Sequence, residues 1–144
     1  MIYGVLGLVA AALFAGAAFY VGFAEHPARE TLDARAQLTQ WKPSYARGAR
    51  MQGGLALVGF VLGLVAWYET GEVRWLVAGA VLLANWPYTL LRILPINNRL
   101  NATPLGNAGA ESRALLEHWG QLHMHRTLLG LASTGLFAWA VIGL

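Results

Sequence analysis

The segment HWGQLHMHRT, residues 118–127, concentrates histidines, an arginine and a tryptophan. On a helix, Trp119, His123 and Arg126 share one face, whereas His118 and His125 share another. Imidazole suits general acid–base catalysis and metal ligation. Histidines on different faces of a regular helix cannot hold one ion, so His123 and the His118/His125 pair are alternative sites. The indole of Trp119, one turn from His123, would form a stacking wall for a flat aromatic ligand.

A second candidate group is Glu25 beside His26, directly before Pro27. If the helix ends converge, as in an antiparallel bundle, this pair lies at the depth of His123. We therefore expect Glu25, His26 and His123 to be the catalytic residues of one site, with Glu25 orienting an imidazole. If a metal such as Cu, Fe or Zn is present, the same three residues are its expected ligands. A haem with His26 or His123 as axial ligand is a further alternative.

The composition excludes several other kinds of site. The chain has no cysteine, so it holds no disulfide, thiolate nucleophile, iron–sulfur cluster or Cys-type zinc site. It has no HExxH motif either, so a zincin-type centre is not supported.

Amide and guanidinium groups beside apolar runs are candidates for contact with a substrate. Asn85, Thr89 and Arg92 share a face of a regular helix, which should point at protein or water. Asn85 and Thr89 could instead form hydrogen bonds between helices. We expect Arg92 to be held by Glu25 or by a ligand, because a charge facing lipid is costly. The expected substrate-binding residues are Gln52, Arg92, Asn97, Trp119 and Arg126. The alternative is that the histidines and arginines at these helix ends lie at a membrane interface without a catalytic role.

Four long runs without any Asp, Glu, Lys or Arg must position these groups. They cover residues 1–24, 51–68, 75–91 and 127–144, and each is about as long as the roughly 20 residues that span a bilayer. The chain is 57% hydrophobic and only 12% charged, far from a soluble balance. The runs predict an all-α integral membrane four-helix bundle in a single domain, residues 1–144. Its spans are expected at about 2–25, 49–68, 74–94 and 116–143.

The connections carry further local signals. Pro27 predicts a kink or restart of the first helix. Residues 28–40 predict a short cytoplasmic or interfacial helix, followed by a break near Pro43. Residues 101–110 predict a flexible loop, and the last helix should begin at about Glu111.

The basic residues are distributed unevenly along the chain. Nine of the ten Lys and Arg residues lie in or beside the first and third connections, against Arg74 alone in the second. The positive-inside rule then makes residues 25–50 and 92–113 cytoplasmic and places both termini outside. We expect an integral protein of a bacterial inner membrane that contacts lipid and binds no nucleic acid.

Several stretches together resemble the anthrone oxygenase family of small four-span membrane proteins. They are EHPA (25–28), QWKPSY (40–45), MQ (51–52), PYT (87–89), PINNRL (95–100), WG (119–120) and LH (122–123) with Arg126. The resemblance implies insertion of oxygen into an electron-rich polycyclic aromatic, without flavin or haem. It further implies deprotonation of the substrate by His123 or His26, followed by attack of the carbanion on dioxygen.

Three hypotheses of different classes follow. The first is a cytoplasm-facing polar pocket that binds a hydrophobic aromatic or quinone-like molecule and oxygenates it as a monooxygenase. In it, Gln52, Arg92 and Asn97 anchor carbonyl or phenolate oxygens. The second is a non-catalytic accessory subunit of a larger membrane complex. A homo-oligomer is the alternative assembly. The third is a haem- or metal-binding membrane protein.

Overall fold

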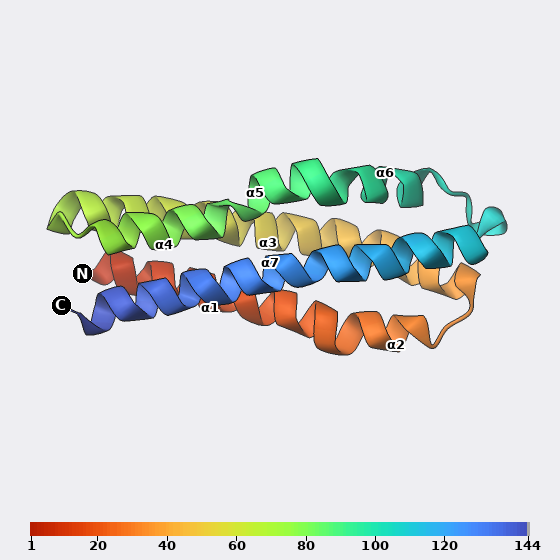
Figure 1. Cartoon of the computed structure of the whole chain (residues 1–144), viewed down its shortest axis with the longest axis horizontal. Helices are drawn as coiled ribbons and strands as arrows, with labels where there is room; N and C mark the ends of the chain where they lie inside the picture. Colours follow the sequence, from red (N-terminus) through yellow and green to blue (C-terminus); the bar gives the residue numbers. More distant parts are fainter. Residues whose placement is uncertain (144) are drawn as a thin grey trace.

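The computed structural model describes residues 1–143, which are almost entirely helical and contain no strand (Figure 1). The prediction of an all-α protein is confirmed. In chain order the elements are α1 (Ile2–Tyr20), η1 (Val21–Glu25), α2 (His26–Glu30), α3 (Ala34–Thr70), α4 (Val73–Leu83), α5 (Asn85–Tyr88), η2 (Thr89–Ile93), α6 (Leu94–Ala102), η3 (Leu105–Asn107) and α7 (Ala110–Ile142).

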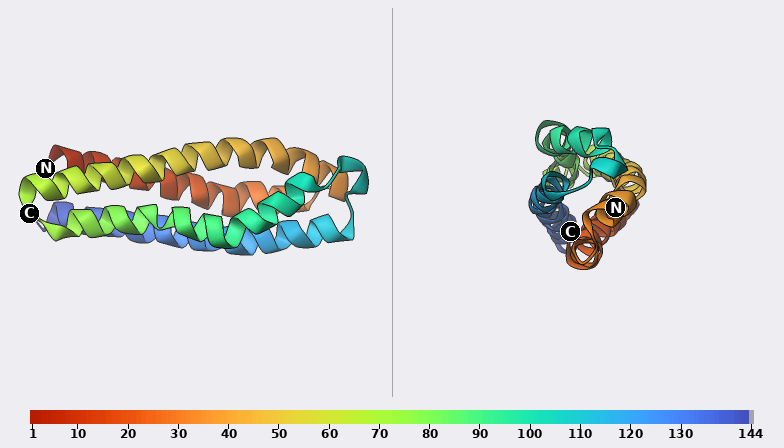
Figure 2. Two further views of the ribbon diagram at one scale, coloured as in Figure 1. Left: turned by 90° about the horizontal axis from the view of Figure 1, so that it is seen from above. Right: turned by 90° about the vertical axis from the view of Figure 1, so that its right-hand side faces the viewer.

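The helices lie side by side along one long axis (Figures 1 and 2). Both α1 and α4 pack against α3 and α7. The two termini lie at one end, and the turns after α2 and α6 lie at the other (Figure 1). Three continuous helical segments, Ile2–Glu30, Ala34–Thr70 and Val73–Ala102, are long and apolar enough to cross a membrane. They indicate an integral membrane protein. The fourth span, expected at about 116–143, stays a prediction, because α7 is not among these three segments.

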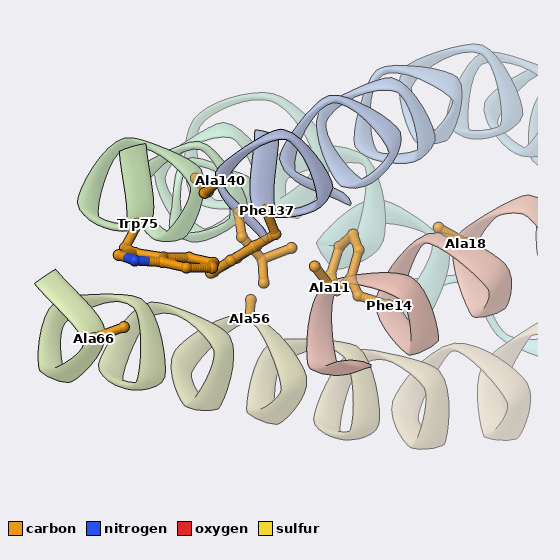
Figure 3. Close-up of a cluster of buried hydrophobic side chains, with 10 residues drawn as sticks. Ala11, Phe14, Ala18, Ala56, Ala66, Trp75, Phe137 and Ala140 are labelled. Carbon is orange, nitrogen blue, oxygen red and sulfur yellow. The ribbon is translucent and has the colours of Figure 1, made fainter. Parts of the chain in front are cut away.

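A cluster of small and aromatic side chains holds the helices together at the end where the termini lie. Figure 3 shows Phe14, Trp75 and Phe137 in this cluster among alanines of neighbouring helices. The ring centroids of Trp75 and Phe137 are 6.1 Å apart. Glycines allow this packing: a Cβ at Gly63 would lie 2.6 Å from the Trp75 carbonyl oxygen. In a lipid environment no hydrophobic effect drives helices together, and small residues allow the close packing that holds them in contact.

A second cluster lies toward the end that carries the turns. The indole of Trp41 stacks on Tyr45 at 4.7 Å and meets Trp119 edge-on at 6.1 Å. Leu38 and Leu100 are fully buried in the same cluster. It therefore ties the start of α3 to α6 and α7.

The expected break near Pro43 is wrong. α3 runs through Pro43 without interruption, and the short separate helix predicted after the first span is the beginning of α3. Asp33 caps it by accepting a hydrogen bond from the Ala36 N–H at 2.9 Å. A proline inside a helix lowers the stability of the helix by about 3 kcal/mol. The burial of Leu38 and Trp41, one turn apart just before Pro43, offsets this loss.

Two widened helical turns precede Pro27 and Pro95. In η1 the His26 N–H bonds to the carbonyl of Val21, and in η2 the Leu94 N–H bonds to that of Thr89. Each bond reaches back five residues instead of four, which defines a π-turn. Because proline has no N–H, the altered bonding beside it lets the helix continue. The expected kink or restart at Pro27 thus takes the form of a widened turn.

Candidate functional site

A small polar cavity lies between η1, α3, α6 and α7. The space open to the centres of water-sized molecules is about 30 Å³, enough for one or two waters. Its walls are formed by Val21, Glu25, Ser44, Tyr45, Gly48, Ala49, Gln52, Ile93, Asn97, Trp119, His123 and Arg126. The structure thus brings together six of the eight residues that the sequence indicated, Glu25, Gln52, Asn97, Trp119, His123 and Arg126.

His123 presents one free imidazole nitrogen. Its side chain is buried, and Nε2 lies 3.1 Å from the carbonyl oxygen of Ala18. A carbonyl can only accept, so Nε2 carries a proton and the neutral ring has its lone pair on Nδ1. Nδ1 has no hydrogen-bond partner within residues 1–143. The ring stacks on Trp119, with centroids 5.0 Å apart. This stacking and the hydrogen bond to Ala18 together fix the orientation of the imidazole.

Arg126 is a buried cation without a carboxylate partner. Only 8% of it is exposed, and Nη2 donates to Oε1 of Gln52 at 3.0 Å. The guanidinium lies over the Phe14 ring at 5.6 Å, while Nε has no partner. None of the salt bridges in the described part of the chain includes Arg126. An uncompensated charge in such surroundings is expensive unless a ligand neutralises it.

Further buried polar atoms at the cavity lack partners. Both amide atoms of Asn97, which is 1% exposed, make no hydrogen bond among the described residues. The indole N–H of Trp119 is equally unsatisfied. Buried polar groups are nearly always hydrogen-bonded, so this concentration of free donors and acceptors marks the cavity as a place for water or a ligand.

Glu25 is already engaged by neighbours on the chain. Its Oε1 accepts from Arg29 Nη2 at 2.6 Å and from Gln40 Nε2 at 3.3 Å, and also from the Ser44 hydroxyl. The expected pair of Glu25 with Arg92 is therefore wrong. Arg92 is exposed and lines an outer groove with Tyr88 and His125. A regular helix would place Arg92 on the same face as Asn85, but the widened turn η2 rotates it away from that face.

His26 is buried next to the cavity but does not line it. Its ring packs against Trp119 at 5.7 Å between centroids. Nδ1 lies 3.2 Å from Arg29 Nη1, which can only donate, and Nε2 lies 3.3 Å from Oε1 of Glu30. A Cβ on Gly120 would collide with the imidazole. His26 and His123 thus both contact the indole of Trp119.

The remaining two histidines lie outside the cavity. His125 is exposed, and its Nδ1 lies 2.8 Å from the Tyr88 hydroxyl. His118 is also exposed. This arrangement separates the two alternatives that the helical spacing left open, and only His123 reaches the cavity.

The donor set does not fit a metal centre. Within residues 1–143, no three His, Asp or Glu side chains come together in a group that could hold an ion. The expected ligands Glu25, His26 and His123 bind separate partners. These three side chains therefore do not form a common set of metal ligands.

A larger lateral cavity adjoins the polar one and shares Ala49 and Arg126 with it. Its volume, measured in the same way as that of the polar cavity, is about 200 Å³. Trp86 and Leu90 are 43% and 57% exposed, so the cavity opens on the apolar outside of the helices. Its walls are Phe14, Ala49, Gly53, Ala56, Asn85, Trp86, Thr89, Leu90 and Arg126.

Neither this lateral cavity nor the place of Tyr45 in the polar cavity was predicted from the sequence. The available signal was the series of small residues Gly48, Ala49, Gly53 and Ala56 along one side of α3. A Cβ added at Gly48 or Gly53 would meet nothing within 4 Å. These glycines therefore leave space open and do not serve close helix packing.

Comparison with known proteins relates the chain to a protein family. The family model described as anthrone oxygenase matches residues 41–136. No curated protein and no solved structure matches the chain. The matched range includes most of the polar cavity but leaves out Glu25 and His26.

Proposed function

Because the chain belongs to the anthrone oxygenase family, we propose that it is a membrane-bound monooxygenase acting on a hydrophobic aromatic with a weakly acidic C–H bond. The observation that carries the proposal is the buried guanidinium of Arg126 without a carboxylate. A substrate that becomes an anion on losing a proton would supply the missing negative charge. The cavity would therefore bind the deprotonated substrate more strongly than the neutral one. Stronger binding of the charge that develops during the reaction is what lowers its barrier.

His123 is the proposed general base. Its Nε2–H bond to Ala18 leaves Nδ1 as the acceptor, and a positioned base of this kind contributes about 10²–10⁴ in rate. Arg126, held by Gln52, stabilises the enolate or phenolate oxygen as charge develops there. Asn97 offers an amide donor to a second oxygen.

The overall reaction balances without an external reductant. The substrate methylene loses one proton to His123, and the carbanion forms a C–O bond with dioxygen. The resulting peroxide anion takes the proton back from His123 to give a hydroperoxide, which loses water as the second C–H bond breaks. One oxygen atom becomes a ring carbonyl and the other becomes water. The four electrons that reduce dioxygen all come from the methylene carbon, which is oxidised to the carbonyl.

The proposed setting is a four-span bundle with residues 25–50 and 92–113 on the cytoplasmic side. The nine basic residues beside these connections support this orientation, as does the position of both termini at the opposite end (Figure 1). The polar cavity would then lie on the cytoplasmic side of the membrane.

Turnover of anthrone by the purified protein tests the function. We expect Arg126→Gln to lower kcat/KM by about 10²-fold, as loss of one charge-stabilising donor does elsewhere. Arg50→Gln is the matched control, since Arg50 is exposed on α3 and lines neither cavity. Equal activity of the two variants would refute the assigned role of Arg126.

A further inference from the structure

The polar cavity is too small for the ring system of a polycyclic aromatic. Its space of about 30 Å³ holds water, whereas the adjoining lateral cavity offers about 200 Å³. The two meet at Arg126. A substrate can therefore place its acidic edge at Arg126 only if its rings lie in the lateral cavity.

Asn85 supplies a second polar contact in the lateral cavity. It is 2% exposed, and its Nδ2 donates to the carbonyl of Leu82 on the preceding turn at 3.0 Å. Its Oδ1 has no partner within the described residues. The expected role of Asn85 as a hydrogen bond between helices is therefore not seen. A buried amide oxygen that accepts no hydrogen bond is destabilising, and a donor group on a ligand would remove this cost.

The mouth of the lateral cavity faces the apolar exterior. Leu90 and Trp86 are exposed there, and the Trp86 indole N–H donates to the Gly53 carbonyl at 3.1 Å. This bond fixes the indole beside Gly53, whose missing side chain leaves the space open. In a bilayer such a mouth would meet lipid and not water.

We propose that the lateral cavity is the binding chamber for the rings of a hydroxylated aromatic that arrives from the bilayer. In this arrangement Asn85 Oδ1 accepts a hydrogen bond from a ring hydroxyl, and Arg126 donates to a carbonyl or phenolate oxygen on the same ligand. The oxygenation chemistry rests on the proposed function, but the chamber and its preference for a hydroxyl do not require turnover.

Binding of two unreactive probes to the protein in nanodiscs tests the chamber. The probes are a dihydroxyanthraquinone and unsubstituted anthraquinone, and the readout is quenching of tryptophan fluorescence. We expect Asn85→Leu to weaken binding of the dihydroxy probe about tenfold and to leave anthraquinone binding unchanged. Equal effects on both probes, or no effect on either, would overturn the role of Asn85.

Gly53→Leu should fill the chamber and weaken both probes about tenfold or more, a loss that corresponds to about 1.4 kcal/mol per factor of ten. Gly54→Leu is the matched control, because Gly54 is exposed and lines neither cavity. Leu90→Trp narrows the mouth from an exposed position and gives a second blocked variant whose folding is not at risk. Unaltered binding by both blocked variants would overturn the chamber.

The outcome also separates this inference from the proposed oxygenation. Tight probe binding that Gly53→Leu abolishes, without any oxidation of anthrone, would keep the chamber and refute the oxygenase. Oxidation of anthrone that persists in Gly53→Leu and Leu90→Trp would keep the oxygenase and refute the chamber.

Discussion

Arg126 and Gln52 form a buried hydrogen bond between α7 and α3, with Nη2 3.0 Å from Oε1. The amide oxygen orients the guanidinium without neutralising it. The pair therefore holds a positive charge at the junction of the two cavities, and this charge is the centre of the functional account.

Replacing Arg126 by methionine should separate stability from binding. Removal of a buried, unpaired charge is expected to leave the unfolding midpoint unchanged or to raise it by a few degrees, since apolar replacements of buried ionic groups are often neutral or stabilising. The same change should weaken the dihydroxyanthraquinone probe about tenfold or more. Thermal unfolding and probe titration measure the two effects. A strongly destabilised Arg126→Met would instead indicate a structural role for the charge.

Gly120→Ala should destabilise the protein, because the new Cβ would collide with the His26 imidazole. The ring is wedged beside Trp119 and cannot move freely, so we expect a loss of about 1–3 kcal/mol from overpacking. Gly135→Ala on the same helix is the control. Gly135 is exposed and has open space at its Cβ position, so alanine there should be neutral or stabilising. Equal unfolding midpoints for Gly120→Ala and Gly135→Ala would contradict the observed packing of His26.

Glu72 links stability to acid pH at the short turn between α3 and α4. Its hydrogen bonds from the Arg74 guanidinium and backbone N–H lower the pKa of the Glu72 carboxyl from 4.5 to about 2. A depressed folded-state pKa contributes stability above the unfolded pKa, and this contribution is lost as the pH falls toward the folded value. Glu72→Gln should thus lower the unfolding midpoint slightly at pH 7, and the difference from wild type should vanish between about pH 4.5 and 2. Glu69→Gln serves as the exposed control. A difference that does not depend on pH would show that the Glu72 charge is irrelevant.

Fusions of topology reporters test the proposed orientation. A reporter at the C-terminus should be active only on the outer side, and one inserted at residues 105–107 should be active only in the cytoplasm, because the basic residues flank the latter turn. The opposite pattern would move the polar cavity to the other leaflet without changing its internal geometry.

Helical periodicity and charge were enough to predict most of the polar side chains that line the polar cavity. Trp119, His123 and Arg126 share a face because α7 is regular through this segment, and their meeting with Gln52 and Asn97 follows from the convergence of helix ends. The same reasoning failed for Arg92. The chain leaves regular helix at Ala84 and again at η2, so Asn85 is buried while Arg92 is exposed.

Other features depend on contacts that no local pattern contains. The continuous helix through Pro43 depends on the burial of Trp41 against Trp119, which is far away in sequence. The lateral cavity is a space left where Gly53 and Ala49 face Trp86 and Arg126. Small residues on a helix face predict close packing as readily as open space, and only the position of the neighbouring helices decides between them.

Oxygen uptake during anthrone oxidation tests the central claim most directly. The protein in nanodiscs should consume one dioxygen per anthrone and exceed the rate of empty nanodiscs. His123→Asn should lower the rate by about 10²-fold or more, while His118→Asn, an exposed change on the same helix, should not alter it. A wild-type rate equal to that of empty nanodiscs, or full activity of His123→Asn, would contradict the account.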